Sequence, residues 1–133
     1  MTRHYTPPSL RILWVDDRPE DNTAFAADLE RRGIRVSIAK STSLALVLLE
    51  RNRYLAVISD MGRKEGPREG FHLLDAMRAR GDGTPFYIFA SLVASSLREE
   101  ASLLDAQGNT HDWGEILLAM DRLASENRTQ NDA

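Results

Sequence analysis

Apolar and polar positions divide the chain into alternating strand-like and helix-like segments. The strand-like segments are short apolar runs with β-branched members, as in buried strands, and the helix-like segments repeat apolar residues every three or four positions. The predicted strands are 10–15, 35–39, 56–59, 85–89 and 107–110. The predicted helices run from Pro19 to Gly33, from Ser41 or Thr42 to Arg51, from Phe71 to Gly81, from Ser95 or Ser96 to Leu104, and from Trp113 to Leu123. This alternation predicts an α/β domain with a parallel sheet and helices on both faces.

The remaining segments set the expected boundaries of the domain. Residues 1–9 contain Pro7-Pro8 and are expected to form a flexible arm, and the polar residues 125–133 are expected to fray as a tail. Residues 61–70 contain three glycines and a proline, which predicts a loop without regular structure. The 133 residues suffice for one domain, expected over residues 10–124.

Three aspartates follow directly after two of the predicted strands. Asp16 and Asp17 close the first strand, and Asp60 closes the third. The carboxyl ends of neighbouring parallel strands converge on one crevice, where α/β sheets bind their ligands. Three carboxylates there repel one another, and a hard divalent cation such as Mg²⁺ is the natural partner. The alternative is that these acids are only polar strand ends that lead into turns.

Composition excludes several classes of function. A net charge of −3 argues against a nucleic-acid partner recruited by bulk charge. Without cysteine, the chain has no disulfides, zinc–thiolate sites or thiol catalysis. No run reaches the roughly 18 apolar residues of a membrane helix, and we expect a cytoplasmic protein with no membrane contact.

Four segments match one family. Residues 12–22, with a strand, paired acids and an early proline, resemble the opening of response-regulator receiver domains. Residues 56–61 resemble the strand that carries the phosphorylated aspartate of that family, 70–74 its next helix start, and 84–89 its fourth strand. The resemblance covers residues 10–123. It implies a doubly wound, flavodoxin-like sheet of five parallel strands in the order 2-1-3-4-5.

The resemblance also implies a function. Asp60 would accept a phosphoryl group from a histidine kinase, a phosphotransfer protein or a small acyl phosphate. Asp16, Asp17 and the backbone carbonyl of Gly62 would hold Mg²⁺ together with Asp60. Phosphoryl transfer needs positioning and charge neutralisation, which such a site supplies. The output would pass through contacts with a protein partner that the sequence does not name, and the domain would be a monomer or a weak homodimer.

Two residues of the family pattern are missing. Receivers carry a Thr or Ser at the end of the fourth strand, where the count from Pro85 gives Ala90. Ser91 is one place further, and a bulge would bring it in as a phosphoryl contact. Receivers also carry a lysine at the end of the fifth strand, but no lysine follows Lys64, and Thr110 or His111 lies nearest that position.

The loop after Asp60 is about two residues longer than the family's short turn. One interpretation is a solvated, charged surface loop. The other is that Lys64 or Arg63 folds back and replaces the missing cation, because an aspartyl phosphate would otherwise have only the metal to balance it.

Three functions remain in competition. The first is the phosphorelay receiver, which is a signalling domain rather than an enzyme. The second is a pseudo-receiver, with the same fold used as a phosphorylation-independent interaction module. The third is a Mg²⁺-dependent phosphatase, disfavoured because those enzymes separate their two aspartates by one residue whereas Asp16 and Asp17 are adjacent.

Overall fold

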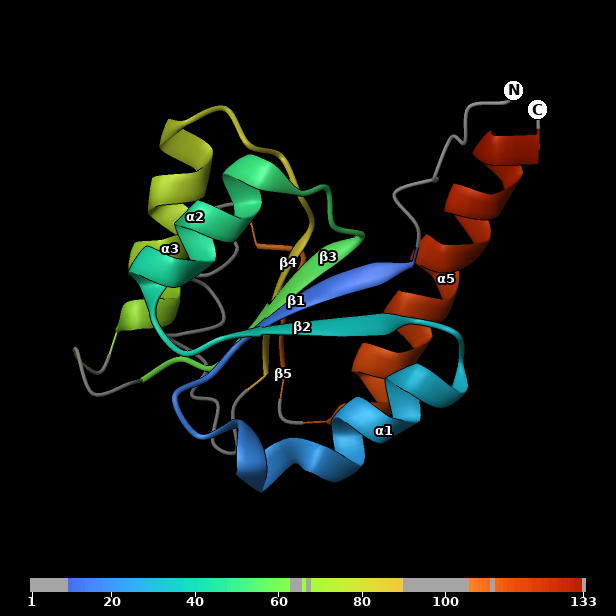
Figure 1. The fold of residues 1–133 in the computed structure, drawn as a ribbon, viewed down its shortest axis with the longest axis horizontal. Helices are drawn as coiled ribbons and strands as arrows, with labels where there is room; N and C mark the ends of the chain where they lie inside the picture. Colours follow the sequence, from blue (N-terminus) through green and yellow to red (C-terminus); the bar gives the residue numbers. More distant parts are fainter. Residues whose placement is uncertain (1–9, 63–65, 67, 90–105, 111, 133) are drawn as a thin grey trace.

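A five-stranded parallel sheet forms the centre of the computed structural model, which describes residues 10–62, 66, 68–89, 106–110 and 112–132, with only the backbone described at 109 and 128–132. The strand order is β2-β1-β3-β4-β5 (Figure 1), as the family resemblance implied. The strands are β1 (Arg11–Val15), β2 (Arg35–Ala39), β3 (Ala56–Ser59), β4 (Phe86–Phe89) and β5 (Gly108–Thr110).

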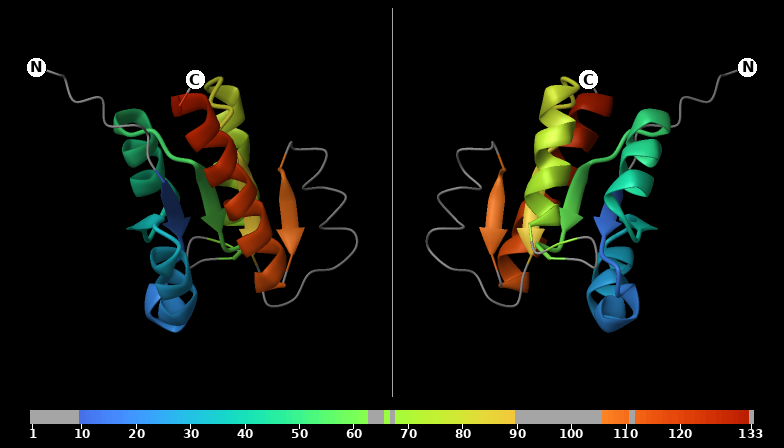
Figure 2. Two further views of the ribbon diagram at one scale, coloured as in Figure 1. Left: turned by 90° about the vertical axis from the view of Figure 1, so that its right-hand side faces the viewer. Right: turned by 90° about the vertical axis from the view of Figure 1, so that its left-hand side faces the viewer.

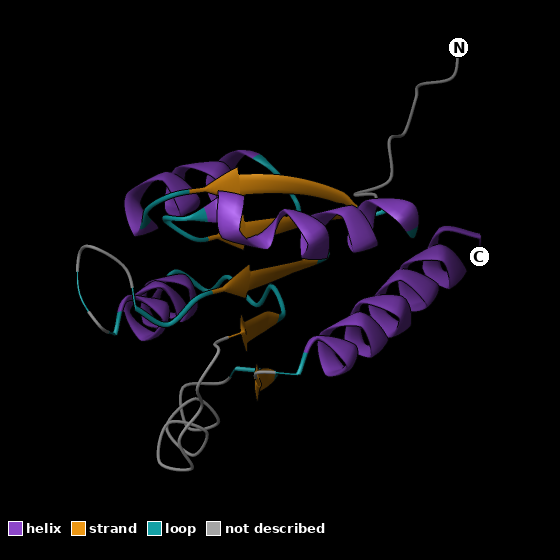
Figure 3. Cartoon of the chain, turned by 90° about the horizontal axis from the view of Figure 1, so that it is seen from below, coloured by secondary structure: helices purple, strands orange, loops and turns teal. Residues whose placement is uncertain are grey.

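Helices cover both faces of this sheet. They are the 3-10 helix η1 (Pro19–Asn22) and the α-helices α1 (Thr23–Arg31), α2 (Thr42–Arg51), α3 (Glu69–Ala79) and α5 (Trp113–Asp132). Helices α2 and α3 pack on one face, and α1 and α5 pack on the other (Figures 2 and 3). The predicted helix from Ser95 or Ser96 to Leu104 lies outside the described residues. No helix in the described ranges has both the length and the apolar character needed to cross a membrane.

Strand β1 divides the hydrophobic core into two layers. Leu13 and Val15 pack under α2 and α3, whereas Ile12 and Trp14 pack under α1 and α5. All four side chains are buried, because the strand lies in the middle of a sheet that is covered on both faces. Full burial of such side chains contributes about 1.5–3 kcal/mol each. This double burial explains why the strand reads as a continuous apolar run.

Three predicted boundaries were wrong. The chain after Pro19 makes a 3-10 turn before α1 begins at Thr23. Helix α3 begins at Glu69, so Gly70 lies in the helix rather than in the loop. Helix α5 does not end at Leu123 but continues through the expected polar tail to Asp132. Ala124 is buried, which shows that the helix still packs on the domain one residue beyond its predicted end.

Strand β5 passes very close to its neighbour β4. Gly108 pairs with Tyr87 in the register, and a Cβ atom at Gly108 would lie 2.9 Å from the Cδ2 atom of the Tyr87 ring. The ring therefore fills the space that a side chain at position 108 would need. Tyr87 also packs against the layer under α1 and α5, and this burial raises the pKa of its hydroxyl above the ordinary value.

Helix α2 has a side-chain cap at its start. The Oγ atom of Ser41 accepts a hydrogen bond of 3.1 Å from the backbone N–H of Leu44. This bond satisfies one of the N–H groups that the first turn of a helix leaves without an intrahelical partner. The sequence predicted that this helix begins at Ser41 or Thr42; in the structure Ser41 is the cap and Thr42 is the first helical residue.

Removal of this cap should destabilise the domain measurably. We expect Ser41→Ala to lower the free energy of unfolding by about 1 kcal/mol, as measured by urea denaturation. Ser43→Ala is the matched control, because Ser43 is exposed on the same first turn and no hydrogen bond of its side chain to a described residue is seen. Equal losses in the two variants would contradict the assignment of Ser41 as the cap.

Candidate functional site

The parallel register brings the acidic residues of β1 and β3 together. Val15 pairs with Ser59, so the next residues along the two strands, Asp16 and Asp60, lie side by side at the carboxyl edge of the sheet. The backbone continues the ladder there: the N–H of Asp60 donates to the carbonyl of Val15 at 3.1 Å. These positions therefore follow from strand pairing rather than from loop conformation.

The three predicted carboxylates converge. Asp16, Asp17 and Asp60 each offer an oxygen atom, and these oxygens lie within 4.8 Å of one another. They line a cavity of about 440 Å³ together with Gly62. Arg18, Asp21 and Asn22 complete the described lining. The residues that the sequence assigned to a metal site thus share one cavity.

Asp16 is the most buried member of the site and has partners at both carboxylate oxygens. Only 7% of its surface is exposed. Its Oδ1 atom accepts a 2.8 Å hydrogen bond from the backbone N–H of Arg18, and its Oδ2 atom accepts one from the side-chain amide of Asn22. These donors fix the orientation of the carboxylate and stabilise its charge.

Three residues of the cavity, Arg18, Asp21 and Asn22, were missed by sequence reasoning. Asp21 and Asn22 lie on the 3-10 turn that Pro19 begins, and this turn brings the Asn22 amide back to Asp16 at the end of β1. The available signal was a polar residue six positions after Asp16, and that signal is weak without knowledge of the 3-10 turn.

The chemistry of the donor set fits a hard divalent cation. Unit charges 4.8 Å apart repel by about 3 kcal/mol at an effective dielectric constant near 20, before screening by salt. Opposite ligands around Mg²⁺ are about 4.2 Å apart, and the remaining positions are usually taken by water or phosphate oxygens. Three carboxylate oxygens within 4.8 Å of one another, in a cavity open to solvent, are near enough to serve as ligands of one such ion.

A glycine allows α3 to approach Asp60. A Cβ atom on Gly70 would lie 2.6 Å from the backbone oxygen of Asp60, a distance that no real side chain tolerates. The N–H of Gly70 instead donates to the carbonyl of Met61 at 2.8 Å. The start of α3 therefore fixes the backbone of Met61, the residue that follows the predicted phosphoryl acceptor Asp60.

The predicted auxiliary residues are not all among those described. Ser91, Lys64, Arg63 and His111 lie outside the described ranges. Thr110, one of the two residues nearest the missing lysine position, is buried at the end of β5. Its hydroxyl donates to Glu115 and accepts a 2.9 Å bond from the N–H of Asp112, so it is engaged with the start of α5.

Aromatic side chains form a cluster in the core layer under α1 and α5. Trp14 precedes Asp16 by two residues, and its ring centroid lies 5.6 Å from that of Trp113 and 6.4 Å from that of Phe89. Phe25 contacts Trp113 at 4.6 Å. The indole N–H of Trp113 donates to Asp28 at 2.9 Å. Tryptophan fluorescence should therefore respond to changes at this edge of the sheet.

Solved structures share this architecture. The Francisella response regulator 1452 receiver domain superimposes with a TM-score of 0.78 at 21% identity, over 89% of this chain and 98% of that one. This chain has the receiver-domain fold. The non-phosphorylated HemR receiver domain from Leptospira biflexa gives a TM-score of 0.73 at 25% identity, over 86% and 94% of the two chains. The signal receiver domain of an HD-domain-containing protein from Pseudomonas fluorescens gives 0.76 at 18%, over 99% and 98%. No protein-family model and no curated protein matches the sequence. The receiver fold thus comes from structural likeness, and the chemistry must be argued from the residues.

The hydrogen bond from Asn22 should matter for metal affinity. We expect Asn22→Ala to weaken Mg²⁺ binding about tenfold, because groups that orient a metal ligand typically contribute that much. The measurement is a Mg²⁺ titration followed by tryptophan fluorescence. Asn52→Ala is the matched control: Asn52 also makes two side-chain hydrogen bonds, to Arg11 and to the carbonyl of Leu48, but at the other end of the sheet. Equal affinities of Asn22→Ala and wild type would contradict this role.

Proposed function

We propose that the chain is a phosphorelay receiver domain in which Asp60 accepts a phosphoryl group with the help of Mg²⁺. The observation that supports this most strongly is the convergence of Asp16, Asp17 and Asp60 at the carboxyl edge of a receiver fold. An edge of this kind is the usual ligand site of open α/β sheets. In the proposed reaction a carboxylate oxygen of Asp60 attacks phosphorus, and the bond from phosphorus to the donor's nitrogen or oxygen breaks. The leaving group keeps the electron pair, and Asp60 becomes an acyl phosphate.

The residues around Asp60 have separate tasks in this proposal. Asp17 and Asp60, with the carbonyl of Gly62, would hold the metal, and Asp16 would join them with its orientation fixed by its two donors. Bound Mg²⁺ would neutralise charge on the carboxylates and on the phosphoryl oxygens. The approach of Gly70 to the backbone of Asp60 would keep the acceptor in place during attack.

The donor and output partners follow from the same proposal. A histidine kinase or a phosphotransfer protein would supply the phosphoryl group, and a downstream protein would read the result. The Francisella, Leptospira and Pseudomonas structures are receiver domains by description, and this likeness supports the assignment of the chain to phosphorelay signalling.

A pseudo-receiver is the second candidate, and one observation favours it. Receivers balance the phosphoryl group with a lysine. Thr110 carries no charge, and its hydroxyl bonds with Glu115 and with the N–H of Asp112. In the part of the cavity lining that the structure describes, Arg18 is the only basic residue. Against this candidate, an interaction module would have no use for three mutually repelling carboxylates.

Phosphorylation with a small donor separates the two candidates. With acetyl phosphate and Mg²⁺, we expect wild type to gain the mass of one phosphoryl group, and Asp60→Asn to gain none because it lacks the attacking carboxylate. Asp75→Asn, which changes an exposed aspartate on α3, is the control and should be labelled like wild type. Intact-protein mass spectrometry gives the readout. An unlabelled wild type would favour the pseudo-receiver.

The loop cation can be tested in the same assay. We expect Lys64→Glu or Arg63→Glu to lower the yield of labelled Asp60 several-fold, because the aspartyl phosphate would lose its balancing charge. Arg53→Glu makes the same change in charge at the opposite edge of the sheet and should leave the yield unchanged. If neither loop variant differs from Arg53→Glu, the loop is only a solvated surface.

A further inference from the structure

Four arginines lie at the end of the sheet where the parallel strands begin, opposite the acidic cavity at their carboxyl ends. Arg11 and Arg35 are the first residues of β1 and β2, and Arg51 and Arg53 lie at and just beyond the end of α2. We call these four residues the arginine surface. Arg35, Arg51 and Arg53 are exposed, and Arg11 is partly buried.

The members of the arginine surface are neighbours in space. Arg11 pairs with Arg35 in the β1–β2 register, so their side chains leave the same face of adjacent strands, which lie about 4.8 Å apart. A guanidinium nitrogen of Arg11 donates to the side-chain oxygen of Asn52 at 3.2 Å. Arg51 and Arg53 flank Asn52 in the sequence. Strand pairing therefore places Arg11 beside Arg35, and the hydrogen bond places Asn52, with its two neighbouring arginines in the chain, beside Arg11.

These arginines lack acidic partners within the described part of the chain. Three other arginines each form an ion pair there: Arg31 with Asp28, Arg32 with Asp121 and Arg80 with Glu50. None of the four arginines of the surface forms such a pair with a described residue. Like charges on neighbouring strands repel, so an anion that bridged Arg11 and Arg35 would relieve this repulsion.

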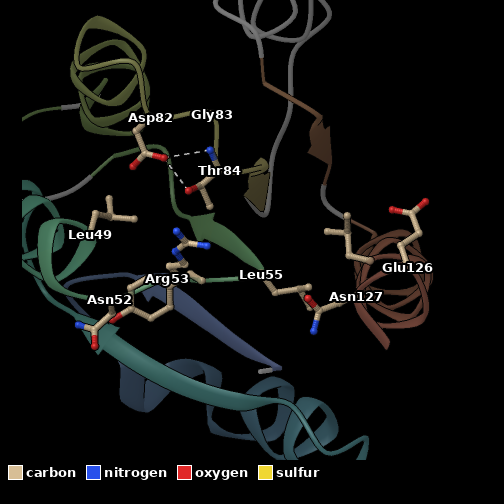
Figure 4. Close-up of a pocket in the computed structure, with 11 residues that line it drawn as sticks. Leu49, Asn52, Arg53, Leu55, Asp82, Gly83, Thr84, Glu126 and Asn127 are labelled. Carbon is tan, nitrogen blue, oxygen red and sulfur yellow. Dashed lines mark hydrogen bonds between the residues drawn. The ribbon is translucent and has the colours of Figure 1, made fainter. Parts of the chain in front are cut away.

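A pocket extends from this surface between α2, the start of β3 and α5. Its volume is about 540 Å³, and Figure 4 shows Arg53 lying within it, between Leu49 and Leu55. Asp82 and Glu126 also line the pocket. Asp82 is engaged by the N–H and hydroxyl of Thr84 (Figure 4). The pocket thus offers one cation beside the leucine side chains at positions 49, 55 and 123, within a lining that is otherwise mainly polar and includes two acidic groups.

We propose that the arginine surface binds an acidic segment of a partner protein, with an apolar side chain of that segment entering the pocket beside Arg53. Carboxylates match the guanidinium groups in charge and in bidentate geometry. Nucleic acid matches this surface less well. The chain has a net charge of −3, and Tyr54, the aromatic residue that lines the pocket, is buried and offers no face for base stacking. The proposal does not depend on phosphorylation of Asp60.

A peptide-binding measurement tests this surface. The probe is a fluorescein-labelled dodecapeptide of glutamate and leucine, titrated with the full chain in low salt and followed by fluorescence anisotropy. The test variant combines Arg35→Glu, Arg51→Glu and Arg53→Glu. The control variant combines Arg31→Glu, Arg32→Glu and Arg80→Glu, which makes the same change in net charge at arginines that already have partners. Matching triple Arg→Gln variants repeat the comparison if a charge-reversed protein does not give the circular dichroism of the folded chain.

The expected result is salt-sensitive binding to wild type, weakened about tenfold in the test variant and much less in the control. Equal weakening in the two variants would show attraction by bulk charge and would overturn the proposal, as would the absence of binding to wild type. A fluorescein-labelled single-stranded oligonucleotide of equal charge is the competing probe, and tighter binding of it would assign the surface to nucleic acid. Asp60→Asn should bind the peptide like wild type, so this result stands apart from the phosphorylation assay.

Discussion

The pairing of β1 with β3 is the constraint on which the rest of the structure depends. Val15 lies beside Ser59, and every residue of β1 from Ile12 to Val15 is buried between two helical layers. A slip of one residue would exchange the two faces of the strand and place each side chain in the wrong layer. The same register sets Asp16 beside Asp60. The packing of the core thus determines the geometry of the candidate site.

The acidic cavity shows how the fold keeps like charges close together. Asp16 is nearly buried, and a backbone N–H and the amide of Asn22 each bond one of its oxygens. Both donors lie on the short segment that connects β1 to α1, so the segment that follows the acids also orients them. A neutral donor such as Asn22 orients the carboxylate without neutralising it, and the full negative charge remains available to a cation.

Sequence reasoning predicted the layers and the convergence of the acids, because both follow from apolar runs and the rule for parallel strand ends. Sequence reasoning failed where the position of a residue in the fold cannot be inferred from its residue type. Composition placed Gly70 in a loop, although the family resemblance placed it at a helix start. It lies in α3, where only glycine allows the helix to approach Asp60. The polar composition beyond Leu123 suggested fraying, but a helix with one packed face needs few apolar residues to continue, and Ala124 is one of them. Asn22 was missed because its contact depends on a 3-10 turn that no periodicity reveals.

The close approach of Tyr87 to Gly108 links two positions that lie far apart in the chain. The aromatic ring occupies the volume that any other residue at 108 would need, so position 108 cannot gain a side chain while the ring at 87 is kept. Chains that descend from the same ancestor should therefore change these two positions in concert, with a smaller residue at 87 whenever 108 gains a side chain. Covariation of positions 87 and 108 among related sequences would therefore reflect the pairing of β4 with β5.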